Sequence, residues 1–313
     1  MELIDPHIDI ASIYDEFKIP IDDFFSQRKD IPVTLSMLKE TEIRIVGFTL
    51  FMDPNLIQTN MFDGVMNYFE FYKELLSKTN ELIQIKSRTE VEDLPSDKVG
   101  FFYSIEGLEC LRDENDFETF YDIGVRSFGL TWEFANDYAT GNGSKNDFGI
   151  TNRGKALLKK MSNHRLIVDT AHLSDRSFVD LDKSFDGIIV NTHANAKAIV
   201  DLPHNLSDDQ IQMIVDHDGL VCLLPTKDEV GGNGTFDDWY KHLDYIASKW
   251  GDDRVALCSD IFPLPEYPFV NNAQNMTVIK DFQNYLLKKL DKDVVQRISF
   301  DNFSNLLKRS LSI

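Results

Sequence analysis

Short apolar runs recur along the chain and alternate with segments whose large apolar residues follow a helical spacing. Runs that are nearly continuous in apolar residues are typical of parallel strands, which are covered on both faces of their sheet. Eight runs are therefore predicted as strands: Leu3–Ile10, Arg44–Phe51, Val99–Ile105, Val125–Thr131, Leu166–Ala171, Gly187–Thr192, Gly219–Leu224 and Arg254–Ser259. Their alternation with helices is typical of a parallel sheet with crossover connections.

The segments between most of these runs are predicted as helices, because large apolar residues recur at positions i, i+3 and i+4. These segments are Phe62–Ile83, Gly154–Met161, Asp208–Val215 and Phe236–Trp250, and the tail adds two closing helices at Met276–Leu290 and Lys292–Leu311. Ser207, with Gln210 three residues later, predicts a capping box at the start of the helix over 208–215.

Eight strands with intervening helices predict an α/β fold, a single (β/α)8 TIM barrel domain over residues 1–313 with C-terminal closing helices. A typical barrel has about 250 residues, and the connection Ala11–Glu42 and the tail accommodate the excess. The rival is an open doubly wound sheet, but its GxGxxG fingerprint is absent after the first strand, where residues 5–9 read Asp-Pro-His-Ile-Asp. The glycine-rich pieces Gly141–Gly143 and Gly231–Gly234 lack a following Lys-Ser/Thr, so neither is a phosphate loop.

Composition and charge narrow the class of protein. Hydrophobic residues make up 42% and charged residues 27%, as in ordinary globular proteins. A formal net charge of −20 argues against a nucleic-acid partner, because so acidic a surface repels phosphate backbones. No apolar run approaches the roughly 20 residues that span a bilayer, and the N-terminus has no signal-peptide pattern, so a cytoplasmic location without a membrane partner is expected. The three cysteines, Cys110, Cys222 and Cys258, are expected to be reduced and buried.

Side chains that can bind metal stand at the ends of five predicted strands. They are His7, Asp9, Glu106, His172, His193 and Asp260. Catalytic groups of a TIM barrel project from the carboxyl ends of its strands, so these six are expected to meet at one mouth. Each alone has a structural interpretation, as a hydrogen-bonded histidine, a helix cap or a turn residue. That such side chains stand at the ends of five predicted strands favours a functional site over these separate structural roles.

The histidines make the same point by their distribution. Three of the seven stand at predicted strand ends. His164, His217 and His242 fall in helices or loops and are interpreted as structural.

The spacing of the strand-end residues indicates two neighbouring ions. His7 and Asp9 are two positions apart in a strand and point the same way, so they can bind one ion together. His172 and His193, from adjacent strands, can share a second ion, and Glu106 has two oxygens that can bridge both. Imidazole and carboxylate ligands suit two zinc ions, with manganese and iron left open. Without metal, three carboxylates in one pocket would repel one another.

Eight stretches carry a resemblance to a known family. They are residues 5–9 (Asp-Pro-His-Ile-Asp), 105–107 (Ile-Glu-Gly), 129–131 (Gly-Leu-Thr), 149–155 (Gly-Ile-Thr-Asn-Arg-Gly-Lys), 168–174 (Val-Asp-Thr-Ala-His-Leu-Ser), 192–196 (Thr-His-Ala-Asn-Ala), 205–208 (Asn-Leu-Ser-Asp) and 259–260 (Ser-Asp). In this order, and over almost the whole length, they resemble the membrane or renal dipeptidase family, peptidase family M19 of the amidohydrolase superfamily.

The resemblance implies a binuclear zinc hydrolase that cleaves the amide bond of dipeptides, often with a D-residue at the C-terminal position. His7 and Asp9 would bind one ion and His172 and His193 the other, with Glu106 between them. A metal-bridging hydroxide would be the nucleophile, and Asp260 would be the proton shuttle. The resemblance also suggests a homodimer.

Two substrate-binding positions depart from the family pattern. Trp132 stands where the family usually has a histidine that holds the substrate carbonyl, and His204 stands where an arginine binds the substrate carboxylate. Indole keeps one N–H donor but does not titrate, and imidazole cannot reproduce the bidentate fork of arginine. Residues 259–263 also lack the second acid and the glycine of the family motif, so that loop is expected to differ in shape.

Three functions stay open from the sequence. The first is a dipeptidase. The second, favoured by Trp132 and His204, is a diverged amidohydrolase that acts on another small amide, lactam or lactone. The third is a metal-bound barrel that binds a partner without catalysis. Asp260 distinguishes this function from the other two, because only an enzyme needs the proton shuttle.

Overall fold

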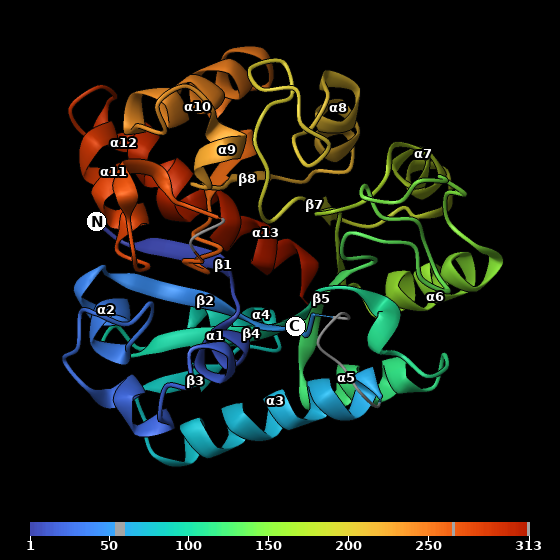
Figure 1. The fold of residues 1–313 in the computed structure, drawn as a ribbon, viewed down its shortest axis with the longest axis horizontal. Coiled ribbons are helices and arrows are strands. Elements are labelled where there is room, and N and C mark those ends of the chain that lie inside the picture. The colour runs from blue at the N-terminus through green and yellow to red at the C-terminus, as the bar shows by residue number, and fades with distance from the viewer. Residues whose placement is uncertain (54–59, 265–266, 312–313) are drawn as a thin grey trace.

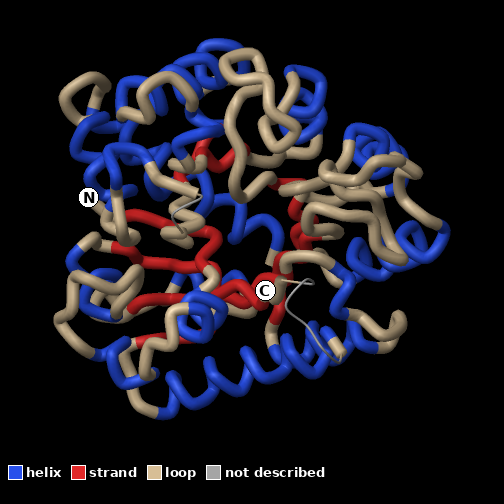
Figure 2. The backbone as a smooth tube through the Cα atoms, in the orientation of Figure 1, coloured by secondary structure: helices blue, strands red, loops and turns tan. Residues whose placement is uncertain are grey.

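The computed structural model describes residues 1–53, 60–264 and 267–311. Its central feature is a curled parallel sheet with the strand order β1-β2-β4-β5-β6-β7 (Figures 1 and 2). The strands are β1 (Leu3–Ile8), β2 (Ile43–Leu50), β4 (Val99–Ile105), β5 (Val125–Gly129), β6 (Ile167–Asp169) and β7 (Ile189–Val190), with β3 (Leu82–Gln84) paired to β4 off this path. Every ladder in it is parallel, which confirms the predicted class of sheet.

A second ladder continues the curl beyond β7. It contains β8 (Val221–Leu223) and β9 (Val255–Leu257), again parallel. A bridge between Asn191 and Val221 links β7 to β8. From β9 to β1 the described residues form contacts without a ladder: the Ser259 amide donates to Asp5 Oδ1 at 3.0 Å, and the Cys258 thiol lies 3.6 Å from the His7 carbonyl. The α/β fold and all eight predicted strands are confirmed, whereas a fully closed eight-stranded barrel is not.

Most of the helices surround the sheet on its outer face (Figure 1). The helices of the described residues are α1 (Ile10–Glu16), α2 (Leu35–Glu40), α3 (Met61–Ser77), α4 (Arg88–Glu92), α5 (Asp116–Ile123), α6 (Asn152–Asn163), α7 (Asp175–Ser184), α8 (Asp208–Asp216), α9 (Lys227–Val230), α10 (Phe236–Trp250), α11 (Val278–Leu286), α12 (Lys292–Gln296) and α13 (Asn302–Ser310). Short 3-10 turns occur at Ile21–Phe25, Leu108–Cys110, Asp252–Arg254 and Val270–Asn272, and a π-helical turn at Arg297–Asp301 joins α12 to α13.

The predicted helices are confirmed with one correction. The capping box of Ser207 and Gln210 is present, and α10 has the predicted bounds. The helix predicted over 62–83 ends at Ser77 instead, and its last apolar residues form β3. The Thr79 hydroxyl accepts from the Glu81 amide at 3.0 Å, which turns the chain. Leu82 and Ile83 continue the apolar pattern, but pairing with β4 satisfies their backbone groups.

Two apolar layers hold this fold together. The larger one lies between the strands and the outer helices. The smaller one fills the inside of the curled sheet, where side chains such as Ile45 and Phe102 meet Phe303 and Leu307 of α13. Helix α13 covers the amino ends of the strands, because the Arg309 guanidinium donates to the Asp218 carbonyl just before β8. The carboxyl ends are therefore left for polar side chains.

Two further observations bear on the sequence expectations. All three cysteines are buried and form no disulfide, as predicted. None of the helices in the described ranges has the length and apolar character that a membrane crossing requires.

Leu307→Ala is expected to lower the free energy of unfolding by about 2–5 kcal/mol, because Leu307 is fully buried in the inner layer and its loss leaves a cavity. Chemical denaturation measures the change. Asn305→Ala on the exposed side of the same helix is the control, with an expected change within about 0.5 kcal/mol. Equal losses in both variants would contradict the role of α13 as the inner plug.

Candidate metal centre

His7 and Asp9 come to the site through an irregular end of β1. The register of β1 on β2 shifts between Asp5 and Ile8, where Pro6 has no amide to donate to the ladder. Gly47 on β2 leaves room for this irregularity, because a Cβ at that position would lie 1.9 Å from the Pro6 carbonyl oxygen. As a result His7 Nε2 lies 3.5 Å from Asp9 Oδ2.

Glu106, the residue after β4, lies between two sets of side chains. Its Oε2 atom lies 3.5 Å from His7 Nε2. Its Oε1 atom lies 3.0 Å from His172 Nε2 and 3.4 Å from His193 Nε2. Each carboxylate oxygen therefore faces a different group of histidines, which is the arrangement that a bridging ligand needs.

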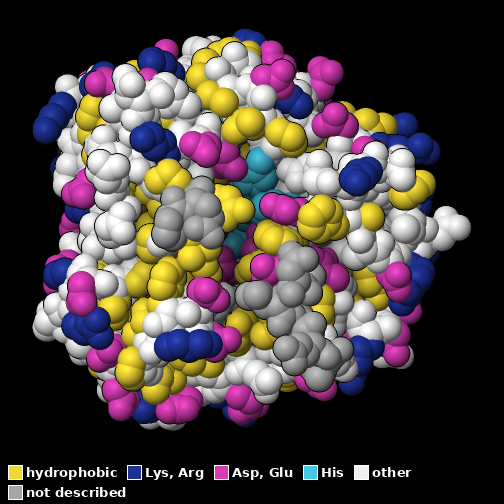
Figure 3. All heavy atoms as spheres, in the orientation of Figure 1, with side chains coloured by type: hydrophobic (Ala, Val, Ile, Leu, Met, Phe, Trp, Pro, Cys, Tyr) yellow, Lys and Arg dark blue, Asp and Glu magenta, His cyan; other side chains and the backbone are white. Residues whose placement is uncertain are grey.

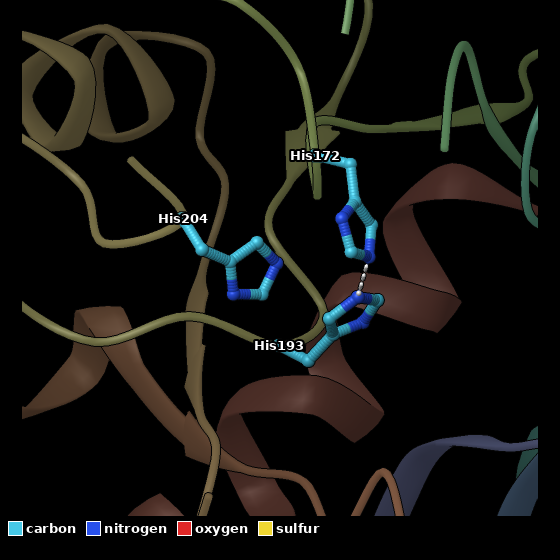
Figure 4. Close-up of side chains that lie close together, drawn as sticks. All are labelled: His172, His193 and His204. Carbon is cyan, nitrogen blue, oxygen red and sulfur yellow. Dashed lines mark hydrogen bonds between the residues drawn. The ribbon is translucent and has the colours of Figure 1, made fainter. Parts of the chain in front are cut away.

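His172 and His193 follow β6 and β7 and point at each other. Their Nε2 atoms are 3.0 Å apart (Figure 4). In tetrahedral geometry, two nitrogens that are bound to the same zinc ion at about 2.0–2.1 Å lie about 3.3 Å apart. His172 has a backbone φ of 61°, a left-handed conformation that is uncommon outside glycine and that persists where the surroundings impose it.

Asp260, after β9, also has a left-handed backbone, with φ of 40°. Its Oδ1 atom lies 3.8 Å from His7 Nε2, so the structure brings Asp260 to the same cluster. Burial raises the pKa of Asp260 to about 7, although His193 and His7 act against the rise.

The site is buried and its charges are unusually close. Burial disfavours the imidazolium of His7, yet Asp9 and Glu106 raise its pKa well above the ordinary value. Burial acts against the Glu106 carboxylate too, but the histidines hold its pKa well below the usual range. In the described part of the chain, the ion pairs of Asp9, Glu106 and Asp260 are with histidine alone.

Unsatisfied atoms test whether these residues fit a metal ion. His7 Nε2 and Asp9 Oδ1 are buried without a hydrogen-bond partner among the described residues. Buried polar atoms are rarely left so, because an unmade hydrogen bond costs about 1–3 kcal/mol. Ligand atoms of His7, Asp9 and Glu106 lie within 4.8 Å of one another. The donor set of imidazole nitrogen and carboxylate oxygen fits a divalent cation.

A network behind the histidines escaped the sequence reasoning. The Thr192 hydroxyl donates to Asp169 Oδ2, and its oxygen lies 2.9 Å from His193 Nδ1 and 3.4 Å from His7 Nδ1. The amides of Ala171 and Thr192 also donate to Asp169, both at 3.1 Å. Groups bound to the outer ring nitrogen fix the orientation of metal-binding histidines. The signal in the sequence was that Thr192 directly precedes His193 and that Asp169 stands three residues before His172.

Trp132 and His204 both lie beside His172. The ring centroids of Trp132 and His172 are 6.3 Å apart, and Phe51 lies 5.2 Å from Trp132 on another side. The His204 ring lies 4.4 Å from that of His172. Every residue singled out for the site thus comes to one place in the fold.

The histidines interpreted as structural have other surroundings. His164 contacts Tyr121, His217 lies 3.1 Å from the Gly187 carbonyl, and His242 accepts from the Ala196 amide at 3.0 Å. Figure 3 shows histidine side chains at the floor of a hollow near the centre of one face, with acidic and hydrophobic side chains at its rim.

Comparison with known proteins identifies relatives of this chain. The family model of the membrane dipeptidases, peptidase family M19, matches residues 1–310. An uncharacterized protein in the pqqA 5' region of Klebsiella pneumoniae is 32% identical over 188 residues, which cover 56% of this chain and 69% of the relative. The dipeptidase tcpJ of Claviceps purpurea is 22% identical over 246 residues, 76% of this chain and 54% of the relative.

One solved structure has the same fold over nearly the whole length. It is a metallo peptidase from Rhodobacter sphaeroides, liganded with a phosphinate mimic of the dipeptide L-Ala-D-Ala. The TM-score is 0.86 with 20% identity, and the match covers 99% of each chain.

Thr192→Val is expected to lower zinc affinity about 10- to 100-fold, because the methyl group cannot link Asp169 to the outer nitrogen of His193. Competition with a chelator of known affinity measures the change. Thr170→Val is the matched control, since that hydroxyl donates to the Val190 carbonyl at 2.9 Å and touches no histidine of the cluster. An unchanged affinity in Thr192→Val, or an equal loss in the control, would contradict the orienting role.

Proposed function

The chain belongs to the membrane dipeptidase family, peptidase family M19, and on this premise we propose that it is a binuclear zinc hydrolase that cleaves the amide bond of dipeptides. One observation carries the proposal. The two oxygens of Glu106 face different partners, His7 on one side and the pair of His172 and His193 on the other. A single carboxylate so placed can serve two ions.

The ligand assignment follows from these contacts. His7 and Asp9 would hold one ion, His172 and His193 the other, and Glu106 would bridge them. Two bound divalent ions lower the pKa of a shared water and polarise the carbonyl of the scissile amide.

Asp260 is the residue that would move the proton. It lies at the edge of the cluster, 3.8 Å from His7 Nε2, and its side chain is 24% exposed, so it can face both the buried centre and an arriving substrate. A carboxyl group within reach of the water and of the leaving amine can carry a proton between them. It can accept a proton from the attacking water and deliver it to the leaving amine. The same residue separates an enzyme from a protein that only binds.

Trp132 and Phe51 would form an apolar wall beside His172. A small substrate bound next to His172 would contact this wall, and the size of the group that fits there would be limited by it. The bacterial relative of the same fold was liganded with a mimic of L-Ala-D-Ala, so both L-L and L-D dipeptides belong in a substrate panel.

A second candidate is an amidohydrolase for another small amide, lactam or lactone. It is favoured because the described ion pairs of the cluster include no Lys or Arg that would receive a substrate carboxylate. Such a substrate would lack the free carboxylate of a dipeptide.

Purified protein is expected to contain about two divalent ions per chain, to hydrolyse L-L or L-D dipeptides, and to lose activity with a chelator until zinc is restored. Elemental analysis and amine release on a dipeptide panel measure this. The same panel includes the matching C-terminal amides, lactams and lactones. Turnover confined to these compounds would replace the dipeptidase by the second candidate, and a metal-replete protein inactive on the whole panel would contradict both.

Asp260→Asn is expected to reduce turnover by about 100- to 10,000-fold, because the amide cannot carry the proton, while both ions stay bound. Steady-state kinetics and metal analysis on the same sample test the two parts. Asp228→Asn, an exposed carboxyl on α9, is the control and should retain full turnover. If Asp260→Asn turns over its substrate as fast as the unmodified protein, the shuttle assignment is wrong.

A further inference from the structure

A third histidine faces the pair of His172 and His193. The His204 ring lies 4.4 Å from that of His172 and 5.4 Å from that of His193. Ligand atoms of all three residues lie within 4.8 Å of one another. Figure 4 shows His204 entering from a separate loop, with one ring nitrogen directed at His172.

The loop that carries His204 is fixed in place by its neighbour. Asn205 is buried, accepts from the Asn195 amide at 3.1 Å, and donates at 3.0 Å to the carbonyls of Val200 and Glu229. The backbones also meet, because the Leu206 amide donates to the Asn195 carbonyl at 2.8 Å. The Asn205 side chain therefore connects the loop to the segment after His193 and to α9. These hydrogen bonds to backbone groups set the position of the neighbouring His204.

Glu229 of α9 occupies the far side of the His204 ring. Its Oε1 atom lies 2.9 Å from His204 Nδ1, and the two side chains are only 19% and 14% exposed. Both ring nitrogens of His204 are buried without a hydrogen-bond partner among the described residues, so the contact of Nδ1 with Glu229 is a close ion-pair contact and Nε2 has no such neighbour. A carboxylate on one imidazole nitrogen with the other nitrogen unpartnered is the usual arrangement of a metal-binding histidine.

We propose that His204 is a third imidazole ligand of the ion held by His172 and His193, and that Glu229 orients it. The proposal rests on the proposed function, because it needs that ion. In tetrahedral geometry, two nitrogens bound to one zinc ion lie about 3.3 Å apart. The ligand atoms of the three histidines lie within 4.8 Å of one another, so His204 would move toward the other two by up to about 1.5 Å on binding.

The two ions would then differ in character. With three imidazoles and one oxygen of Glu106, the second ion would have four protein ligands, and the shared water would be its fifth. The ion at His7 and Asp9 would have three protein ligands and would keep the more open position. His204 would no longer be free for a substrate carboxylate, which revises the substrate-binding role expected from the sequence.

Cobalt(II)-substituted protein tests the proposal directly. Each cobalt-bound histidine gives one strongly shifted, exchangeable N–H signal in the proton NMR spectrum. Four such signals are expected, from His7, His172, His193 and His204, and His204→Ala should remove one. Three signals in the unmodified protein would overturn the proposal by themselves, without any need for the variant to fold.

Zinc affinity provides a second readout. His204→Ala is expected to weaken one ion by at least about 100-fold, and Glu229→Gln the same ion by about 10- to 100-fold, with the other ion unaffected. His217→Ala is the matched control, because this histidine pairs with Asp182 and does not belong to the cluster. The His217→Ala protein should bind both ions normally. Normal binding of both ions by His204→Ala would overturn the ligand role and leave the proposed function standing. An unmodified protein that binds fewer than two ions would contradict the proposed function itself.

Discussion

Three carboxylates, those of Asp9, Glu106 and Asp260, lie together at the carboxyl end of the curled sheet, largely withdrawn from water. Removing such groups from water costs several kcal/mol each unless an opposite charge compensates. The compensation here comes from imidazoles, whose charge depends on protonation, and it leaves His7 Nε2 and Asp9 Oδ1 without a hydrogen-bond partner among the described residues. Divalent cations would resolve this conflict, since they neutralise carboxylates and bind neutral imidazole at once. The surrounding structure is arranged to bring these groups to that one place.

The amino end of the sheet contributes to stability, and the carboxyl end carries the candidate site. At the amino ends, α13 inserts Phe303 and Leu307 into the inner apolar layer, and Asn302 and Arg309 of the same helix donate to backbone carbonyls just before the strands. These contacts anchor the amino ends of the strands. Left-handed backbones occur at both ends of the sheet, but the irregularity at Pro6 and the left-handed backbones of His172 and Asp260 stand at the carboxyl end, beside the cluster. Strain of that kind persists where a well-packed scaffold imposes it.

The sequence pattern predicted the strands well because each is apolar on both faces, a signal that needs no tertiary information. It also placed His7, Glu106 and His193 together, since parallel strands end at a common edge. It missed β3, because Leu82 and Ile83 extend a helical pattern and only pairing with β4 distinguishes them. Contacts between loops were out of reach as well. The approach of Glu229 to His204 depends on Asn205, a single amide that joins two connections distant in the sequence.

The contact between Glu229 and His204, which Asn205 holds in place, bears on how the chemistry of the pocket can have changed. An arginine at position 204 would place a permanent cation opposite Glu229, and the two would pair rather than leave the guanidinium for a substrate. A histidine in the same place can be neutral, and with Glu229 on one nitrogen its other nitrogen could bind an ion held by His172 and His193. On the proposal above, the same substitution that removes a carboxylate receptor would supply a metal ligand. On this argument the pocket would select substrates by the shape of its Trp132 wall and by the open ion, and less by the charge of the substrate.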